Sequence, residues 1–357
     1  MRVGISLLTL APGDLGGSET YARALLRGLA TSGSLDYTVF APRHAADAAS
    51  GLPVVPVRTL PGARRGPRRI PATRLTAAAS RAVRKALSGV DVIHYPLTVP
   101  IPAAHAPTIV TLQDLQHLDF PEHFSAARRR FRKRAYDSAA QGANAVVVTS
   151  AFVRARAIER LGLDEKRVHV IPLGVDHALF APGDDAREAF LLYPARPWPH
   201  KNHRRLLEAF GLLRAELPEL RLVLTGGGLD ALGPLPEGVQ RVGAVPVEEL
   251  ASLYRTAACL VFPSLYEGFG LPPLEAMALG TPVVVSTAAA LPEVCGEAAV
   301  QVAPDDARAL AGALERLLDD PAERSRRSEA GRAHARRFRW DIVGAHLVEV
   351  YRSLVPT

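Results

Sequence analysis

Two carboxylates, Glu267 and Glu275, flank a glycine-rich turn in this chain. An apolar run ends at Phe262, Gly268 and Gly270 follow, and two prolines then open a helix, where their missing N–H groups cost nothing. Free N–H groups at such a helix start attract anions, and glycines let the backbone approach a ligand closely. The carboxylates could accept hydrogen bonds from two sets of sugar hydroxyls. The alternative is a pair of surface carboxylates beside an ordinary turn, but the whole string favours a site.

A second cluster carries positive charge. Arg196 offers a planar fork of donors and Lys201 a point charge, and both suit a diphosphate. Prolines between them stiffen the loop. The alternative is a solvated basic loop; beside the two carboxylates we favour a ligand-binding role.

A third cluster follows the first expected strand. Gly16 and Gly17 would present amides to a phosphate or bring the chain close to an acceptor, and Ser18 is a good helix N-cap. The spacing is not the Rossmann dinucleotide fingerprint, so alone it is a weak signal.

Motifs for other chemistry are missing from the sequence. It has no Asp-x-Asp pair, no Walker loop, no Gly-x-Ser-x-Gly elbow and no His-Glu-x-x-His. We therefore expect no metal and no cofactor, and phosphate charge neutralised by Arg, Lys and backbone amides.

Short apolar runs alternate with helical patterns along the chain, which predicts parallel sheets covered on both faces. Strands are expected at residues 3–10, 37–40, 54–57, 90–94, 108–112, 145–149 and 168–171, and again at 190–193, 221–225, 239–242, 259–262, 282–285 and 299–302. Helices are expected at residues 19–30, 75–87, 126–140, 151–161, 206–213, 247–256, 272–279 and 307–318.

The repeated pattern predicts an α/β protein of two doubly wound, Rossmann-like domains joined by a Pro/Gly-rich segment near residues 172–183. The expected N-terminal domain covers residues 1–178 and the C-terminal domain residues 179–340. Ligands bind beyond the carboxyl ends of such strands, so two facing domains would enclose a cleft.

The composition is that of a soluble globular protein, with 48% hydrophobic and 22% charged residues among 357. The two cysteines indicate neither a disulfide framework nor a zinc site, and no targeting or membrane-spanning segment is visible. We expect a cytoplasmic protein. The net charge of +7 is concentrated partly in two basic segments, residues 62–70 and 128–134.

Together these segments resemble glycosyltransferase family 4, whose members have the two-domain GT-B fold and retain anomeric configuration. The Glu267–Glu275 string is the most specific part. Supporting matches are the Gly16-Gly17 loop, Arg196 with Lys201, residues 224–228 and residues 280–284. The resemblance implies that a C-terminal helix, residues 341–357, crosses back onto the N-terminal domain.

The resemblance also implies roles for individual residues. Glu267 would contact the donor sugar, Glu275 the ribose, and Arg196 and Lys201 the diphosphate. Further donor-binding groups would be Gly16, Gly17, Gly268, Phe269, Gly270, Leu271, Val242 and Gly243, the last two near the base.

One position departs from the family pattern. Many members carry a histidine beside the donor sugar where this sequence has Gln113, which can donate a hydrogen bond but carries no charge. His117 could supply the missing catalytic group. Alternatively, it is a loop histidine without a catalytic part.

The prediction is a retaining hexosyltransferase, with mannose or glucose favoured, using a GDP- or UDP-linked donor. Its acceptor would be a glycan, a lipid-linked sugar or a small molecule, as in polysaccharide biosynthesis. The alternatives are a GT-B-like sugar-nucleotide epimerase and a non-catalytic sugar-nucleotide binding protein. The basic segments could hold an anionic membrane surface, with solvated arginines as the alternative, whereas no motif indicates nucleic acid.

Overall fold

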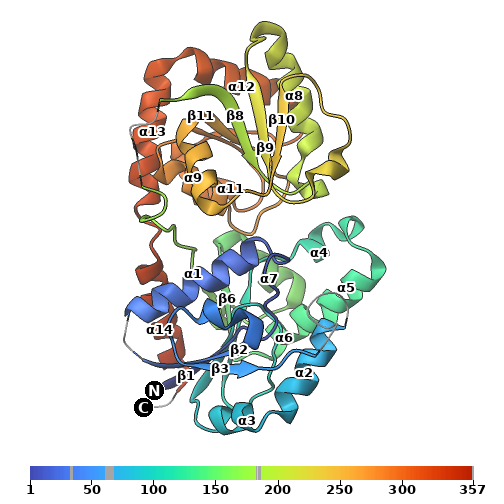
Figure 1. Cartoon of the computed structure of the whole chain (residues 1–357), viewed down its shortest axis with the longest axis vertical. Helices are drawn as coiled ribbons and strands as arrows, with labels where there is room; N and C mark the ends of the chain where they lie inside the picture. The colour runs from blue at the N-terminus through green and yellow to red at the C-terminus, as the bar shows by residue number, and fades with distance from the viewer. Residues whose placement is uncertain (33–34, 61–67, 182, 184–185, 356–357) are drawn as a thin grey trace. The chain divides into compact units, whose positions relative to one another are not determined.

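The computed structural model describes residues 1–32, 35–60, 68–181, 183 and 186–355, which form two α/β units (Figure 1). The first unit comprises Met1–Gly174 and Trp340–Thr357, and the second comprises Val175–Arg339. The backbone N–H of Val175 donates to the Phe338 carbonyl at 3.0 Å, and Val175 forms a parallel bridge with Arg339. Residues 175–178 therefore belong to the second unit and not, as the sequence predicts, to the first.

The first unit is built on a parallel sheet of seven strands in the order β3-β2-β1-β4-β5-β6-β7. The strands β4, β5 and β6 are almost wholly buried, which explains their continuous apolar sequences. The strand bounds are β1 Arg2–Ser6, β2 Asp36–Pro42, β3 Val54–Val57, β4 Val92–Tyr95, β5 Thr108–Leu112, β6 Ala145–Val148 and β7 Val168–Val170.

The helices of the first unit depart from expectation at two places. The expected helix at 75–87 is two helices, because Ser80 adopts an extended conformation and its hydroxyl caps the second. The expected helix at 126–140 is interrupted by a π-helical turn, Lys133–Asp137. The bounds are α1 Gly17–Ser32, α2 Arg69–Ala79, α3 Arg81–Leu87, α4 Gln116–Asp119, α5 Ala126–Arg132, α6 Ser138–Gly142, α7 Ala151–Leu161 and α14 Trp340–Ser353.

The C-terminal helix α14 packs along α1 in the first unit (Figure 1). A buried polar chain fixes it: His94 Nδ1 lies 2.8 Å from the Tyr351 hydroxyl, and His94 Nε2 lies 2.8 Å from Thr111 Oγ1. Burial lowers the pKa of His94 to about 3, so the imidazole is neutral and fully bonded near neutral pH.

The second unit is built on a parallel sheet of six strands in the order β10-β9-β8-β11-β12-β13. Its strands are β8 Glu188–Pro194, β9 Arg221–Thr225, β10 Val239–Gly243, β11 Ala257–Phe262, β12 Val283–Ser286 and β13 Val300–Val302. Its helices are α8 His203–Glu216, α9 Val247–Thr256, α10 Leu271–Ala278, α11 Leu291–Cys295, α12 Ala307–Asp319 and α13 Pro321–Ala335. All thirteen expected strands are therefore present, and most are shifted at one or both ends.

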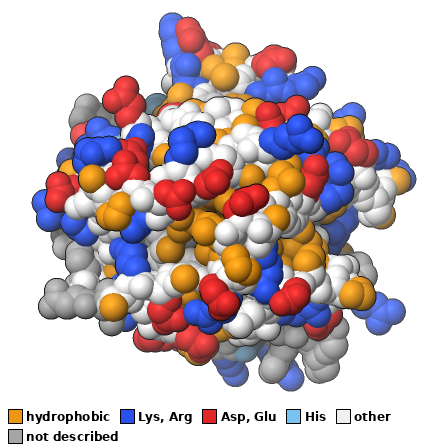
Figure 2. All heavy atoms as spheres, turned by 90° about the horizontal axis from the view of Figure 1, so that it is seen from above, with side chains coloured by type: hydrophobic (Ala, Val, Ile, Leu, Met, Phe, Trp, Pro, Cys, Tyr) orange, Lys and Arg blue, Asp and Glu red, His pale blue; other side chains and the backbone are white. Residues whose placement is uncertain are grey.

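Charge on the surface is mixed. On the face shown in Figure 2, basic and acidic side chains are interspersed and neither sign forms a continuous patch. Within the part of the chain that the structure describes, no helix combines the length and apolarity needed to cross a membrane.

Candidate functional site

The second unit brings the two predicted clusters together. Lys201 follows β8 in a short 3₁₀ turn, and its Nζ lies 2.5 Å from Glu267 Oε1 in the loop after β11. Both side chains are only 14% exposed. The Leu265 N–H also donates to the His200 carbonyl at 2.7 Å. The basic loop and the glutamate loop therefore form one surface at the carboxyl ends of neighbouring strands, where parallel sheets bind ligands.

Arg196 lies beside this surface and contacts the loop after β9. Its guanidinium lies 5.7 Å from the Trp198 ring centroid, and a Cβ built on Gly227 would be 3.9 Å from it. Gly226 has φ of 138°, and a Cβ there would come within 2.9 Å of the Ala195 carbonyl group. Only glycine fits such a backbone position, so residue 226 allows the two loops to approach.

The helix α10 begins directly after the glycine-rich turn, with Gly270 at its N-cap at φ of 120° and proline in its first turn. Phe269 is buried, and Leu271 is the first residue of the helix. Pro272 and Pro273 carry no N–H, so at the helix start only the turn residues up to Leu271 can offer backbone N–H groups to an anion.

Glu275 lies one turn further along α10 and is 8% exposed. Tyr254 Oη donates to its Oε2 at 3.1 Å. Burial raises the pKa of Glu275 to about 7; the bond from Tyr254 opposes this rise and the charge of Asp176 adds to it. Near neutral pH this carboxyl group is therefore balanced between its neutral and ionised forms.

The residues predicted near the base form an irregular strand end. The pairing of β10 with β9 shifts between Arg241 and Gly243, so Val242 bulges out and is 42% exposed. The Gly226 N–H and the Thr225 hydroxyl each donate to the Gly243 carbonyl at 2.7 Å. An exposed apolar side chain is thus held beside the Arg196 loop.

In the first unit, Gly16 and Gly17 lie at the start of α1, beside a pocket. Gly17 begins the helix, so Ser18 is within its first turn and does not act as the expected N-cap. The Ser18 hydroxyl instead donates to Gln113 Oε1 at 2.6 Å. The glycine loop and the position that departs from the family pattern are therefore adjacent.

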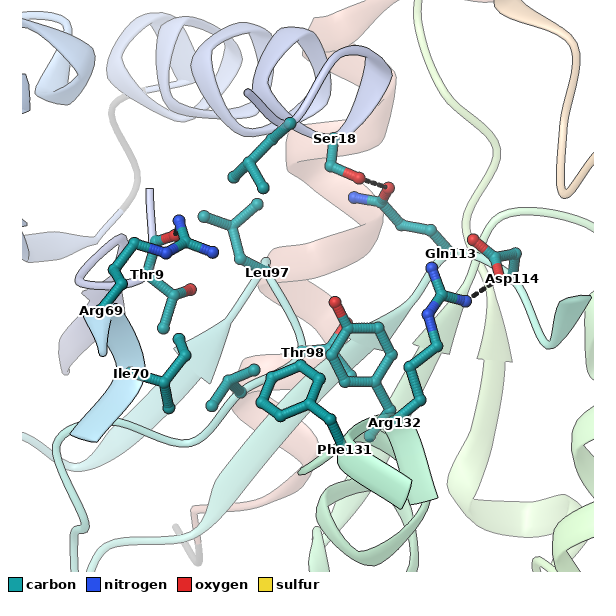
Figure 3. A pocket seen from close by; sticks show the side chains of 13 residues that line it. Thr9, Ser18, Arg69, Ile70, Leu97, Thr98, Gln113, Asp114, Phe131 and Arg132 are labelled. Carbon is teal, nitrogen blue, oxygen red and sulfur yellow. Dashed lines mark hydrogen bonds and ion pairs between the residues drawn. The ribbon is translucent and has the colours of Figure 1, made fainter. Parts of the chain in front are cut away.

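Figure 3 shows this first-unit pocket, with Arg69 on one side and Asp114 and Arg132 on the opposite side. Arg69 Nη1 donates to the Thr9 carbonyl at 2.6 Å. Arg132 Nη1 lies 2.8 Å from Asp114 Oδ1. Burial acts to raise the pKa of Asp114, but the charge and hydrogen bond of Arg132 hold it below the ordinary value.

His117 is not among the residues that line this pocket. It lies on α4, 3% exposed, with Nε2 at 2.8 Å from Asp137 Oδ1, and its ring makes edge contacts with those of Phe124 and Tyr136. The catalytic role of His117 stays a prediction, and its burial and its bond to Asp137 favour the alternative of a histidine that stabilises the fold.

The two basic segments, residues 62–70 and 128–134, are not simply exposed positive charge. Residues 61–67 lie outside the described part of the chain, and Arg69 lines the pocket. In the second segment Arg128, Arg129 and Arg130 are exposed, but Arg132 pairs with Asp114 and lies 5.1 Å from the Tyr136 ring centroid. The segment is therefore not one solvated basic face.

Glu267, Lys201, Arg196, Glu275 and the α10 start thus belong to the second unit, and Gly16, Gly17 and His117 to the first. Among the described residues, no three His, Cys, Asp or Glu side chains are grouped to hold a metal.

Four contributing residues carry no distinct signal in the sequence. Tyr254, the partner of Glu275, carried no signal beyond its place in an amphipathic helix. Arg69 and Arg132 were interpreted as members of basic runs. Gly226 lies in the segment 224–228 that resembles the family, and nothing in the sequence marks its close approach to Ala195.

Comparisons with known proteins cover both units. Residues 15–179 match Glycosyltransferase Family 4, and residues 177–334 match Glycosyl transferases group 1. The O-antigen chain mannosyltransferase B of Escherichia coli is 30% identical over 285 residues, covering 74% of this chain and 75% of that protein.

Another relative is the MMP alpha-(1->4)-mannosyltransferase of Mycolicibacterium hassiacum, 40% identical over 205 residues, or 53% of this chain. The chain spans about half (49%) of that relative. A solved structure of sucrose-phosphate synthase from Thermosynechococcus elongatus superposes with a TM-score of 0.78 at 24% identity, covering 99% of each chain.

Proposed function

The chain belongs to glycosyltransferase family 4 and has the two-domain GT-B fold, and we propose that it transfers a hexose from a nucleotide diphosphate to an acceptor. It is a glycosyltransferase, and the epimerase and binding-protein alternatives are not favoured. Mannose or glucose remains the favoured hexose, and the two mannosyltransferase relatives support mannose. The nucleotide is UDP or GDP.

The observation that carries this proposal is the joining of Lys201 and Glu267 beside the start of α10. Transfer breaks the bond between the sugar carbon and the diphosphate, so negative charge develops on the leaving phosphate oxygen. Lys201, Arg196 and the helix-start amides stabilise that charge more than they stabilise the bound donor, which accelerates the reaction.

Glu267 would hold Lys201 in position and accept hydrogen bonds from the donor sugar. Glu275, deeper in the same helix, would accept hydrogen bonds from the ribose. The acceptor oxygen bonds to the sugar carbon on the face that the diphosphate leaves, and the acceptor proton passes to the leaving phosphate oxygen. Configuration is thereby retained without a covalent enzyme intermediate and without a metal.

The test is turnover of GDP-mannose and UDP-glucose, following nucleoside diphosphate release. Transfer or slow hydrolysis releases it, epimerisation converts the sugar without release, and a binding protein does neither. We expect release with one of the two nucleotides, and its loss in Lys201→Ala. No release from any nucleotide hexose would contradict the proposal.

We also propose that the protein binds peripherally to an anionic membrane surface. Arg128, Arg129 and Arg130 are exposed on α5, next to Phe131, which is 41% exposed. Each cation near an anionic surface contributes roughly 1 kcal/mol.

We expect salt-sensitive co-sedimentation with anionic vesicles, lost when these three arginines become Ser. The control replaces three exposed arginines of the second unit, Arg204, Arg308 and Arg316, by Ser. Equal sedimentation with anionic and neutral vesicles would exclude the membrane role.

A further inference from the structure

Arg69 brings a positive charge to the first-unit pocket, and the charge of Asp14 partly offsets it from a distance. Among the described residues, no carboxylate oxygen lies within ion-pair distance of its guanidinium, whose hydrogen bond goes to the Thr9 carbonyl. A guanidinium carries five N–H donors, so most of them remain available. Burial lowers the pKa of Arg69, which indicates a charge that is partly removed from water.

Gln113 brings a second donor to the same pocket. Its Oε1 accepts from Ser18, and its Nε2 is buried without a hydrogen-bond partner among the described residues. Figure 3 shows this amide nitrogen turned toward the middle of the pocket. A buried donor without a partner costs roughly 1–3 kcal/mol, so an acceptor atom in the pocket would relieve that cost.

The opposite wall does not compete for these donors. The carboxylate of Asp114 is engaged by Arg132 at 2.8 Å, so among the described lining residues Arg69 is the cation without an ion-pair partner. The exposed ring of Phe131 offers an apolar face on the same wall. The pocket thus presents donors from two sides, Arg69 on one and Gln113 on the other, together with an apolar ring.

The size of the pocket limits what those donors can hold. Its volume is about 70 Å³. At roughly 10–15 Å³ for each water-sized group, this is room for about five to seven heavy atoms. A phosphate group has five, whereas a whole hexose would extend out of the opening.

We propose that the first-unit pocket binds the acceptor through a phosphate group, held by Arg69 and Gln113, with the hydroxyl-bearing part of the acceptor outside. This rests on the proposed function, since it assigns a chemical class to the acceptor of the same transfer. The phosphate could belong to a soluble sugar or polyol phosphate or to a lipid headgroup.

The first experiment measures phosphate binding with the nucleotide site filled. Inorganic phosphate is titrated by calorimetry into the full chain saturated with UDP or GDP. We expect binding in the wild type, weakened about tenfold to a hundredfold in Arg69→Gln, as for loss of a charged hydrogen bond. Arg69→Lys should restore part of the affinity, and Gln113→Leu should reduce it less than Arg69→Gln does.

Arg68→Gln is the matched control, because Arg68 carries the same charge, is exposed and does not line the pocket. It should bind phosphate as the wild type does. Equal phosphate affinity in Arg69→Gln and Arg68→Gln would overturn the proposal.

The second experiment compares acceptors in turnover. Glycerol 3-phosphate is paired with glycerol, mannose 6-phosphate with mannose, and vesicles containing phosphatidylinositol with vesicles of phosphatidylcholine. Preference for a soluble phosphate or for the inositol lipid supports the proposal and identifies the source, provided that Arg69→Gln removes the preference.

Equal turnover of phosphorylated and unphosphorylated partners, or a preference that persists in Arg69→Gln, would overturn the proposal. Donor hydrolysis would then still proceed, so the proposed function would stand. Failure to release nucleoside diphosphate under any condition would instead contradict the function itself.

Discussion

In the second unit, Lys201 and Glu267 neutralise each other at 2.5 Å, and Glu275 accepts a hydrogen bond from Tyr254. In the first unit, Arg69 bonds a backbone carbonyl, and among the described residues Gln113 Nε2 has no partner. The second-unit site is therefore organised before any ligand arrives, and a ligand must exchange contacts there. The first-unit pocket has N–H donors without an acceptor among the described residues, so a ligand could accept hydrogen bonds from them without displacing an existing contact.

Breaking the Lys201–Glu267 pair should have the largest effect. We expect Lys201→Ala to reduce kcat by about a hundredfold or more, because a charge contact to the leaving diphosphate is lost. The measurement is steady-state turnover of the preferred nucleotide hexose.

Arg204→Ala serves as the control, since Arg204 is exposed on α8 only three positions away. Wild-type turnover in Lys201→Ala would remove the basic loop from the site.

The carboxyl of Glu275 gives the second-unit site a pH dependence. Because its pKa lies at about 7, the ionised form, which accepts hydrogen bonds from a ribose, should increase about tenfold between pH 6 and pH 8. Affinity for the nucleotide hexose should therefore rise with pH by about that factor.

Calorimetry across this pH range tests the expectation, with Glu275→Gln as the control that should bind with no such pH dependence. The same titration affects folding stability in the opposite direction, because stability falls as the pH rises. The raised pKa of Glu275 stabilises the fold at pH below about 4.5, and this contribution is lost as the pH rises through about 7. A rise in affinity that persists in Glu275→Gln would assign it to another group.

Removing metal ions should have the smallest effect. The second-unit site supplies Arg196, Lys201 and helix-start amides for the diphosphate, so we expect turnover in EDTA to equal turnover without it. Strict dependence on added Mg²⁺ or Mn²⁺ would contradict this account of charge neutralisation.

The two regions also differ in how far the sequence predicted them. The bounds of β3, β5 and β9 match the expected ranges, since continuous apolar runs mark buried parallel strands. The residues of the second-unit site lie in short continuous segments, whose turns and helix starts can be predicted from the local sequence without knowledge of tertiary contacts. The hydrogen-bond donors to each carboxylate could not be predicted, because they depend on packing between elements. Tyr254, which donates to Glu275, is an example.

The first-unit pocket could not be predicted in this way, because its walls come from separate segments after β1, β4 and β5 and from α1, α2 and α5. Arg69 and Arg132 look alike in the sequence, as members of basic runs. Only the fold distinguishes Arg132, which is paired with Asp114, from Arg69, which forms no ion pair among the described residues. The π-helical turn that ends α5 left no mark in the sequence pattern either.

The central claim is that the nucleotide binds in the second unit and the acceptor phosphate in the first. Calorimetric titration of the preferred nucleoside diphosphate into the wild type, Glu275→Ala and Arg69→Gln tests it most directly. The account predicts affinity reduced about tenfold or more in Glu275→Ala, where charged hydrogen bonds are lost, and unchanged in Arg69→Gln. Unchanged affinity in Glu275→Ala, or an equal loss in Arg69→Gln, would contradict it.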